Sequence, residues 1–198
     1  MKEMISMVVV LTLLSVFSGG SLAYLRDITK DRIEKQQLKF VKGPAVMSVL
    51  TNTSNNPVET YFKLNEGTKE ERTVFVGMVD GKPKYVAFEG SVKGYGGNIG
   101  LMIGVDLQTD RIIGVGITTH AETPGMGARA KTDPAFTDQF KGKPFTESFK
   151  VKNDGGQIDA LSGATVTSRG VALGVTQAGA LYKELKPQIL EGLKKVTK

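Results

Sequence analysis

The stretch TVFVGMVDGKPKYVAFEGSV, residues 73–92, carries the clearest indication of the fold. Two runs rich in Val, Phe and Tyr, at 73–79 and 83–92, flank the turn sequence DGKP at 80–83. β-branched and aromatic residues favour strands, and an Asp-Gly pair favours the tight turn of a hairpin. We therefore expect an antiparallel hairpin over this stretch.

Similar short runs lie on both sides of this hairpin. Further strands are predicted at 58–64, 100–107 and 111–120, with LQTDR at 107–111 as a second hairpin connection and TNTSNNP at 51–57 as a turn. Helical patterns follow at 134–141, at 166–185 and, as a last charged helix, from Pro187 onward. Successive strands joined by tight turns predict an antiparallel meander, and the later helices place the chain in the α+β class.

Composition limits the chemistry of this chain. A length of 198 residues suits one well-buried domain plus an extension. The sequence has no Cys, which excludes disulfides, thiolate-bound zinc and cysteine-ligated iron–sulfur clusters held by this chain alone. Redox chemistry would therefore require an organic cofactor. The net charge of +6 is compatible with anionic lipids, acidic partners or phosphate, whereas scattered lysines without a recognition motif argue against nucleic acid.

The N-terminal segment is apolar enough to cross a membrane. No charged residue occurs from Met4 to Leu25, and we assign residues 1–25 as a transmembrane anchor. The alternative is a cleavable signal peptide, because the small residues around Ala23 resemble a cleavage site. Residues 26–42, rich in paired opposite charges, are expected to form a helical stalk, and 43–198 the soluble domain. Lys and Arg are more numerous after the span than before it, which by itself would place this domain inside the cell.

Two glycine-rich loops resemble nucleotide-binding motifs but depart from them. GYGGNIG at 94–100 has Ile99 where a GxGxxG fingerprint needs glycine, and a strand pattern follows it instead of a helix. GMGARAKT at 125–132 has Ala130 at the second required glycine of a P-loop. A Rossmann domain and nucleotide hydrolysis are therefore not expected. Plain turn formation is the simplest alternative for these loops.

A third loop, DALSGATVTSRG at 159–170, is rich in hydroxyl groups and leads directly into a helical pattern. The N-terminus of a helix favours a phosphate because its backbone N–H groups are free and its dipole is positive there. As a plain helix cap, Ser162 or Thr165 would contribute only about 1 kcal/mol. Capping does not explain Gly163 and Ala164, which leave space beside Thr165 for a large group.

The sequence DALSGATVTS resembles the attachment motif of the covalent FMN-binding domains. Asp159, Ser162, Gly163, Ala164 and Thr165 match that motif in full. The resemblance implies that FMN is joined through a phosphoester bond to the hydroxyl of Thr165.

Two further segments resemble flavin loops of the same family, GYGGNIG at 94–100 and HAETPGMG at 120–127. The resemblance implies that Glu122 and Thr123 contact the isoalloxazine ring. Met126 would pack on the ring, or would serve only to pack its own loop. The cofactor-binding residues expected from these loops are Gly94, Tyr95, Gly96, Glu122, Thr123, Gly125, Met126 and Gly127.

Two charged or titratable residues beside these motifs have alternative roles. Lys152 would neutralise the phosphate, or it is a solvated surface lysine. His120, the sole histidine, would tune or protonate the reduced flavin, or it is structural. No Ser-His-Asp set, catalytic residue or metal ligand is expected. The resemblance therefore implies that a separate flavin transferase attaches the cofactor.

The whole chain resembles the G subunits of Rnf electron-transport complexes, which are thought to link ferredoxin and NAD redox chemistry to ion pumping. The alternatives are the related C subunits of sodium-pumping NADH:quinone reductases and a membrane-anchored flavin-binding or regulatory module without a relay role. The first resemblance implies a redox-carrier protein with membrane partners and no turnover in isolation. It also implies that the chain is located in the cytoplasmic membrane, with the flavin domain on the extracytoplasmic side. This orientation is opposite to the one that the distribution of Lys and Arg around the span would give.

Overall fold

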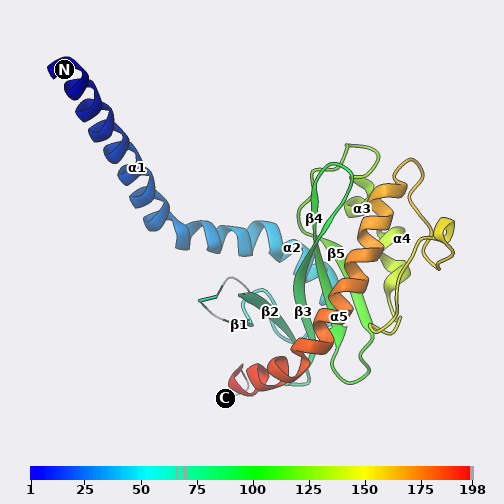
Figure 1. Cartoon of the computed structure of the whole chain (residues 1–198). Coiled ribbons are helices and arrows are strands. Elements are labelled where there is room, and N and C mark those ends of the chain that lie inside the picture. Colours follow the sequence, from blue (N-terminus) through cyan, green and yellow to red (C-terminus); the bar gives the residue numbers. More distant parts are fainter. Residues whose placement is uncertain (66, 69–70, 197–198) are drawn as a thin grey trace. The chain divides into compact units, whose positions relative to one another are not determined.

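A computed structural model of the chain describes residues 1–65, 67–68 and 71–196. The chain divides into two compact units, Met1–Leu38 and Lys39–Lys198. Each unit is described by itself below (Figure 1).

The first unit is a single helix, α1, spanning Lys2–Gln36. Its portion Lys2–Lys30 is long and apolar enough to cross a membrane, with a mean hydropathy of 2.0 over its most apolar stretch. A signal sequence near the N-terminus would also meet this criterion of length and hydropathy. The charged segment expected as a stalk is α-helical only as far as Gln36. Beyond it the backbone forms the π-helix η1, Gln37–Lys42, which leads into α2, Gly43–Val49.

The second unit is built on a five-stranded antiparallel sheet in the order β1-β2-β3-β4-β5. Every strand pairs with its neighbour in sequence, so the expected meander and the α+β class are confirmed. The DGKP hairpin joins β2 to β3, and the second hairpin joins β4 to β5. The strands are β1 (Tyr61–Leu64), β2 (Arg72–Val79), β3 (Lys82–Lys93), β4 (Asn98–Asp106) and β5 (Ile112–Ile117).

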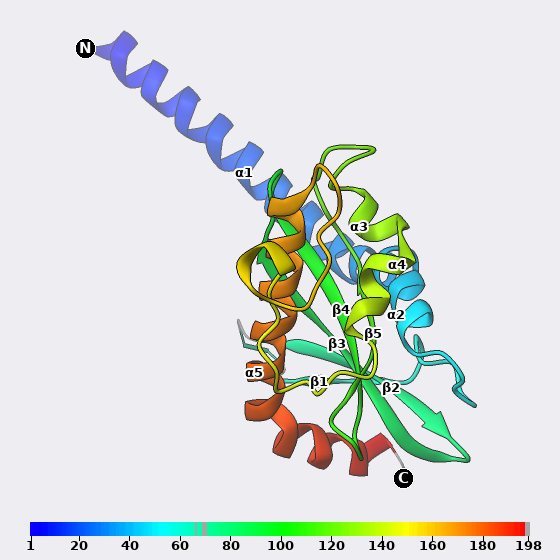
Figure 2. The ribbon, with the colours of Figure 1, turned by 90° about the vertical axis from the view of Figure 1, so that its right-hand side faces the viewer.

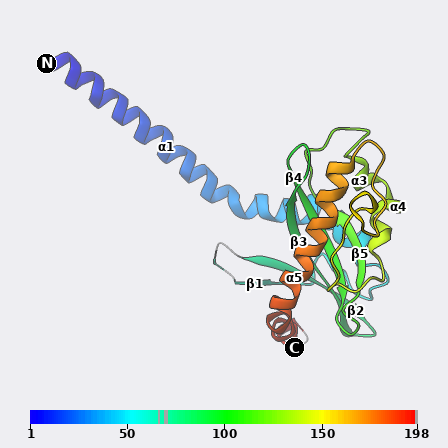
Figure 3. The same ribbon diagram turned by 45° about the vertical axis from the view of Figure 1, so that its right-hand side comes forward.

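Helices cover both faces of this sheet. The long helix α5, Thr165–Val196, packs on one face, and α2 packs against β4 and β5 on the other (Figure 2). Figure 3 shows α5 crossing β3 and β4. The short helices α3 (Arg129–Thr132) and α4 (Pro134–Thr137), followed by the 3-10 turn Asp138–Phe140, lie beside β5. A second 3-10 turn, Lys152–Asp154, precedes the loop that leads into α5.

The helix α5 buries an apolar face at helical spacing. Gly170 and Gly174 let it approach the sheet closely: a Cβ on Gly170 would lie 2.7 Å from the carbonyl oxygen of Lys93. Such contact with a backbone oxygen leaves no room for a larger residue. The side chains buried on this face are Val171, Val175, Ala178, Tyr182, Leu185 and Ile189.

The prediction of a separate helix from Pro187 onward is wrong. Pro187 lies inside α5, which continues to Val196. Proline removes one backbone hydrogen bond and bends a helix. The axis of α5 changes direction near this point (Figures 1 and 2). The helix continues because Ile189 and Leu193, beyond the proline, are buried in the same core as Leu185.

A polar cluster fastens the β4–β5 hairpin to α5. Asp110 accepts a hydrogen bond of 2.8 Å from the Tyr182 hydroxyl and forms an ion pair of 2.6 Å with Lys186. Burial opposes ionisation of Asp110, but hydrogen bonds from Lys186 and Tyr182 and the Lys186 charge outweigh it and lower its pKa. Burial, together with the hydrogen bond to Asp110, raises the pKa of Tyr182 above its usual value. Both shifts favour a neutral Tyr182 phenol that donates a hydrogen bond to an ionised Asp110 carboxylate.

This cluster predicts a loss of stability at high pH. Since the folded-state pKa of Tyr182 is raised, its contribution is complete below about pH 10, where an unfolded tyrosine ionises, and is lost above that pH. We expect the free energy of unfolding to fall with a slope of at most about 1.4 kcal/mol per pH unit from this one group. Denaturant titrations from pH 8 to 11 on wild type and Tyr182→Phe would measure it. Equal slopes in both proteins would contradict the assignment.

Candidate functional site

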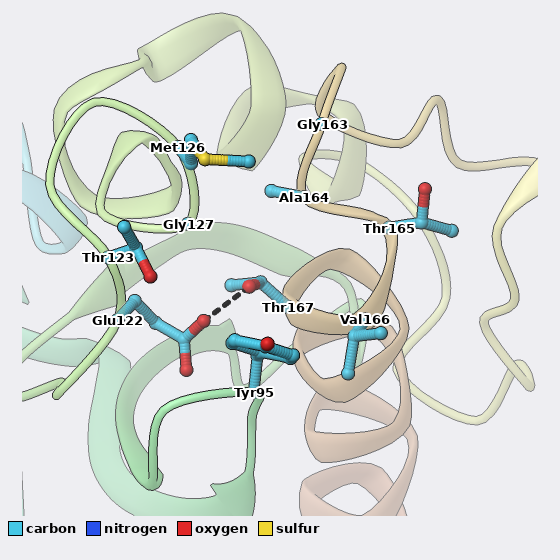
Figure 4. A pocket seen from close by; sticks show the side chains of 10 residues that line it. All are labelled: Tyr95, Glu122, Thr123, Met126, Gly127, Gly163, Ala164, Thr165, Val166 and Thr167. Atoms are coloured by element: carbon cyan, nitrogen blue, oxygen red, sulfur yellow. Dashed lines mark hydrogen bonds between the residues drawn. The ribbon is translucent and has the colours of Figure 1, made fainter.

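A cavity of about 480 Å³ lies where three loops of the second unit meet. The loops are 94–97 between β3 and β4, 118–128 after β5, and 159–164 before α5. This volume lies within the usual range of small-molecule sites. The residues that line the cavity, shown in Figure 4, are Tyr95, Glu122, Thr123, Met126, Gly127, Gly163, Ala164, Thr165, Val166 and Thr167.

Glycines allow these loops to lie against one another. A Cβ on Gly127 would lie 2.6 Å from Glu122 Oε2 and 2.7 Å from Thr167 Oγ1. A Cβ on Gly96 would collide with the backbone carbonyl of Ala121. Gly96 therefore allows close approach of two backbones, whereas Gly127 leaves room for the side chains of Glu122 and Thr167.

Glu122, in the loop after β5, links the β3–β4 loop to helix α5. Its side chain is buried, with 6% of its surface exposed. Oε1 accepts a hydrogen bond of 2.9 Å from the backbone N–H of Gly96, and Oε2 accepts one from the Thr167 hydroxyl. Figure 4 marks the second bond with a dashed line. The carboxylate thus joins the β3–β4 loop to the first turn of α5.

The first turn of α5 offers free donors to the cavity. The helix begins at Thr165, and its first hydrogen bond runs from the Ser168 N–H to the Ala164 carbonyl at 3.0 Å. In the described part of the chain, the N–H groups of Thr165, Val166 and Thr167 have no hydrogen-bond acceptor. These groups and the helix dipole make the turn suitable for a phosphate.

The hydroxyls of residues 162–168 differ sharply in their contacts. The buried Ser168 Oγ accepts a 2.9 Å hydrogen bond from the Leu161 N–H and donates to the Ala164 carbonyl, so it holds the loop to the helix. Thr167 is buried and bonded to Glu122. Within residues 1–65, 67–68 and 71–196, the hydroxyls of Ser162 and Thr165 make no hydrogen bond. Neither residue therefore caps the helix through its side chain, which was the alternative role considered from the sequence.

Of these two residues, only Thr165 lines the cavity. Thr165 is half-buried and lines the cavity, whereas Ser162 is exposed and does not. In Figure 4 the Thr165 hydroxyl points away from the Glu122–Thr167 pair. Gly163, two residues before Thr165, has a φ of +76°, a conformation that favours glycine.

Several expected site residues lie outside the lining. Gly94, Gly96 and Gly125 shape the loops without lining the cavity. Asp159 and Lys152 are exposed and form an ion pair of 2.8 Å with each other. His120 is half-exposed, and its Nδ1 accepts a 3.3 Å hydrogen bond from the Glu122 N–H.

Two lining residues were not selected from the sequence, Val166 and Thr167. Both belong to the first turn of α5, directly after Thr165. The helix predicted at 166–185 already placed Val166 and Thr167 at a helix N-terminus. That position is the one signal in the sequence that could have identified them.

The cavity fits a flat aromatic ring bearing a phosphate. Its rim carries three exposed apolar side chains, Tyr95 (73% exposed), Val166 (48%) and Met126 (47%). Exposed apolar side chains gathered in this way are typical of a place where a ligand or partner binds. The free N–H groups of α5 lie at the same cavity. An apolar rim beside phosphate donors suits FMN.

Comparison with known proteins agrees with this fit. Residues 94–180 match the family of FMN-binding domains. The chain is 32% identical over 181 residues to the G subunit of the ion-translocating oxidoreductase complex of Vibrio atlanticus, covering 85% of each chain. It is 31% identical over 201 residues to the protein of that name in Pseudomonas aeruginosa, covering 96% of this chain and 93% of the relative.

Solved structures show the same fold. The C subunit of the Na(+)-translocating NADH-quinone reductase of Parabacteroides distasonis superposes with a TM-score of 0.61 and 27% identity, over 78% of this chain and 95% of that chain. Shewanella oneidensis NqrC gives a TM-score of 0.52 and 25% identity, over 75% and 73%. The resemblance found in the sequence motifs is thereby confirmed.

Proposed function

The chain belongs to the family of G subunits of ion-translocating oxidoreductase complexes, and on this premise we propose that it is a membrane-anchored electron carrier whose FMN is bonded through phosphate to Thr165. The bound FMN would supply reversible uptake and release of electrons. The chain itself would supply the attachment point, the phosphate donors and the surroundings of the ring.

One observation carries this proposal: of the hydroxyl-bearing residues at 162–168, Thr165 is the one that lines the cavity and whose hydroxyl makes no hydrogen bond to a described residue. The neighbouring hydroxyls of Thr167 and Ser168 are buried and engaged in hydrogen bonds. A phosphate on Thr165 Oγ1 would lie next to the free N–H groups at the start of α5, where a negative charge is favoured. The apolar rim would receive the ring.

Attachment requires a separate flavin transferase in this proposal. His120, the sole histidine, accepts from the Glu122 N–H and does not line the cavity, so it is not placed to activate Thr165. The transferase would bring an activated flavin nucleotide. A P–O bond to Oγ1 forms, the bond to the nucleotide leaving group breaks, and the hydroxyl proton passes to a base of the transferase.

The family also supports a proposal for the assembly and location of the chain. The relatives are named as subunits of a complex, so the partners proposed are its other membrane subunits. We place the chain in the cytoplasmic membrane through α1, with the flavin domain on the extracytoplasmic side and electrons moving between ferredoxin and NAD. The isolated chain would show no turnover. The C subunits of sodium-pumping quinone reductases share this fold and remain the alternative complex.

Intact-mass and peptide mass spectrometry test the proposal on full-length chain matured in its native host. We expect one FMN phosphoester per chain, on the peptide that contains Thr165. A wild-type chain without the adduct would contradict the covalent carrier and favour a binding or regulatory module. An adduct on Ser162 would contradict the assignment of the hydroxyl.

A further inference from the structure

Glu122 is unusual among the acidic side chains of this chain. Of the side chains that the structure describes, it is the one acidic residue in the buried class. It also lines the cavity proposed for the flavin. Burying a carboxylate is costly unless its charge is compensated, so a buried acid beside a redox site calls for a specific explanation.

The partners of Glu122 are neutral. Both of its oxygens accept hydrogen bonds, one from the Gly96 N–H and one from the Thr167 hydroxyl. Among the residues that the structure describes, no lysine, arginine or histidine forms an ion pair with it. Two donors directed at the two oxygens suit an ionised carboxylate, which only accepts. The positive end of the α5 dipole lies at Thr167 and favours the same state.

We propose that the Glu122 carboxylate is an electrostatic control group that lowers the reduction potential of the flavin. This proposal rests on the proposed function, because it requires FMN at this cavity. Gly96 and Thr167 act as positioning residues that hold the charge in place. In this proposal the hydroxyl of Thr167 donates its hydrogen bond to Glu122 and not to the flavin phosphate.

The direction of the effect follows from charge balance. Two-electron reduction takes two electrons from a reduced donor, which is a redox group of another protein of the complex or dithionite in a titration. When the ring takes up one proton from solvent with these electrons, its charge becomes more negative by one unit. A fixed negative charge nearby opposes this change, and the interaction is stronger away from bulk water. Reduction becomes harder and the potential falls.

Two variants separate charge from structure. Glu122→Gln keeps the shape: its amide oxygen accepts from the Gly96 N–H, while its amide nitrogen donates to the Thr167 hydroxyl, which then acts as acceptor. Thr167→Val keeps the charge and removes one of its two donors, so the carboxylate is less well compensated. Thr167→Ser, which restores the hydroxyl, is the matched control. If these substitutions only loosened the cavity, the midpoint potentials of Glu122→Gln and Thr167→Val would shift in the same direction.

The experiment is a spectroelectrochemical titration at pH 8 of full-length chain loaded with FMN in its host. We expect Glu122→Gln to raise the midpoint potential of the flavin. The equilibrium should shift toward the reduced flavin by tenfold or more, which is about 30 mV for a two-electron couple. Thr167→Val should shift the midpoint in the opposite direction, and Thr167→Ser should match wild type. Intact mass on each sample first establishes the FMN load.

The outcomes distinguish this inference from the proposed function. A wild-type chain without FMN overturns both. Loaded wild type and loaded Glu122→Gln with equal midpoints overturn only the role of Glu122. If Glu122→Gln does not fold, Thr167→Val decides the matter, since a midpoint that is unchanged or more positive than that of wild type would contradict the charge effect.

Discussion

Thr165→Ala is expected to abolish covalent flavin completely. The substitution removes the oxygen to which phosphorus would bond, and the neighbouring hydroxyls of Thr167 and Ser168 are buried and already engaged. The measurement is flavin fluorescence of the band on a denaturing gel, after coexpression with a flavin transferase and export. We expect a fluorescent band for wild type and a dark band for the variant.

The fold should be unaffected by this change. The Thr165 hydroxyl makes no hydrogen bond within the described residues, so the free energy of unfolding of the flavin-free chain should change by less than about 0.5 kcal/mol. Ser162→Ala serves as the matched control and should retain fluorescence. A fluorescent Thr165→Ala band would show that another residue carries the flavin.

Phe88→Ala should cause the largest loss of stability. Phe88, on β3, is 1% exposed and contacts Tyr182 of α5 in a stacked arrangement, with 6.2 Å between ring centroids, and Phe145 at 6.1 Å. Truncation leaves a cavity between the sheet and α5. We expect the free energy of unfolding to fall by about 3–5 kcal/mol. Urea unfolding of the full-length chain in detergent, followed by circular dichroism, measures it.

The control for this core position is Tyr95→Ala, an equally drastic truncation at a side chain that is 73% exposed. Surface truncations away from special contacts usually change stability by less than about 0.5 kcal/mol. A loss for Phe88→Ala as small as that for Tyr95→Ala would mean that α5 does not depend on this aromatic cluster.

Much of the sheet could be predicted from local sequence. The strand runs around DGKP and LQTDR lie close to the observed β2–β5, because hairpin turns and β-branched residues act over a few neighbouring positions. Helix α2 was not predicted. Its Val46 and Val49 are buried against the sheet, where a Cβ on Gly114 would lie 3.2 Å from the backbone of Val49. Nothing local in residues 43–49 indicates that contact.

In the candidate site, too, some features could be predicted from local sequence and others depend on tertiary packing. The three loop motifs could be recognised one at a time, and Glu122, Met126 and Thr165 do lie at one cavity. The bond between Glu122 and Thr167 joins positions 45 residues apart, so it depends on the packing of α5 against the sheet. The roles of the individual hydroxyls likewise depended on which of them had partners, a property of the folded chain.

The order of the strands along the chain also has a consequence for biogenesis. Because each strand pairs with the one made just before it, the sheet can form progressively as the chain emerges, and low contact order of this kind favours rapid folding. The loops that carry Tyr95 and Glu122 are synthesised well before Thr165 and the helix that begins there. In the proposed function, the residue that would accept the cofactor is thus made after the loops that carry Tyr95 and Glu122, and a folding-sensitive transferase would act only on chains that extend beyond Thr165.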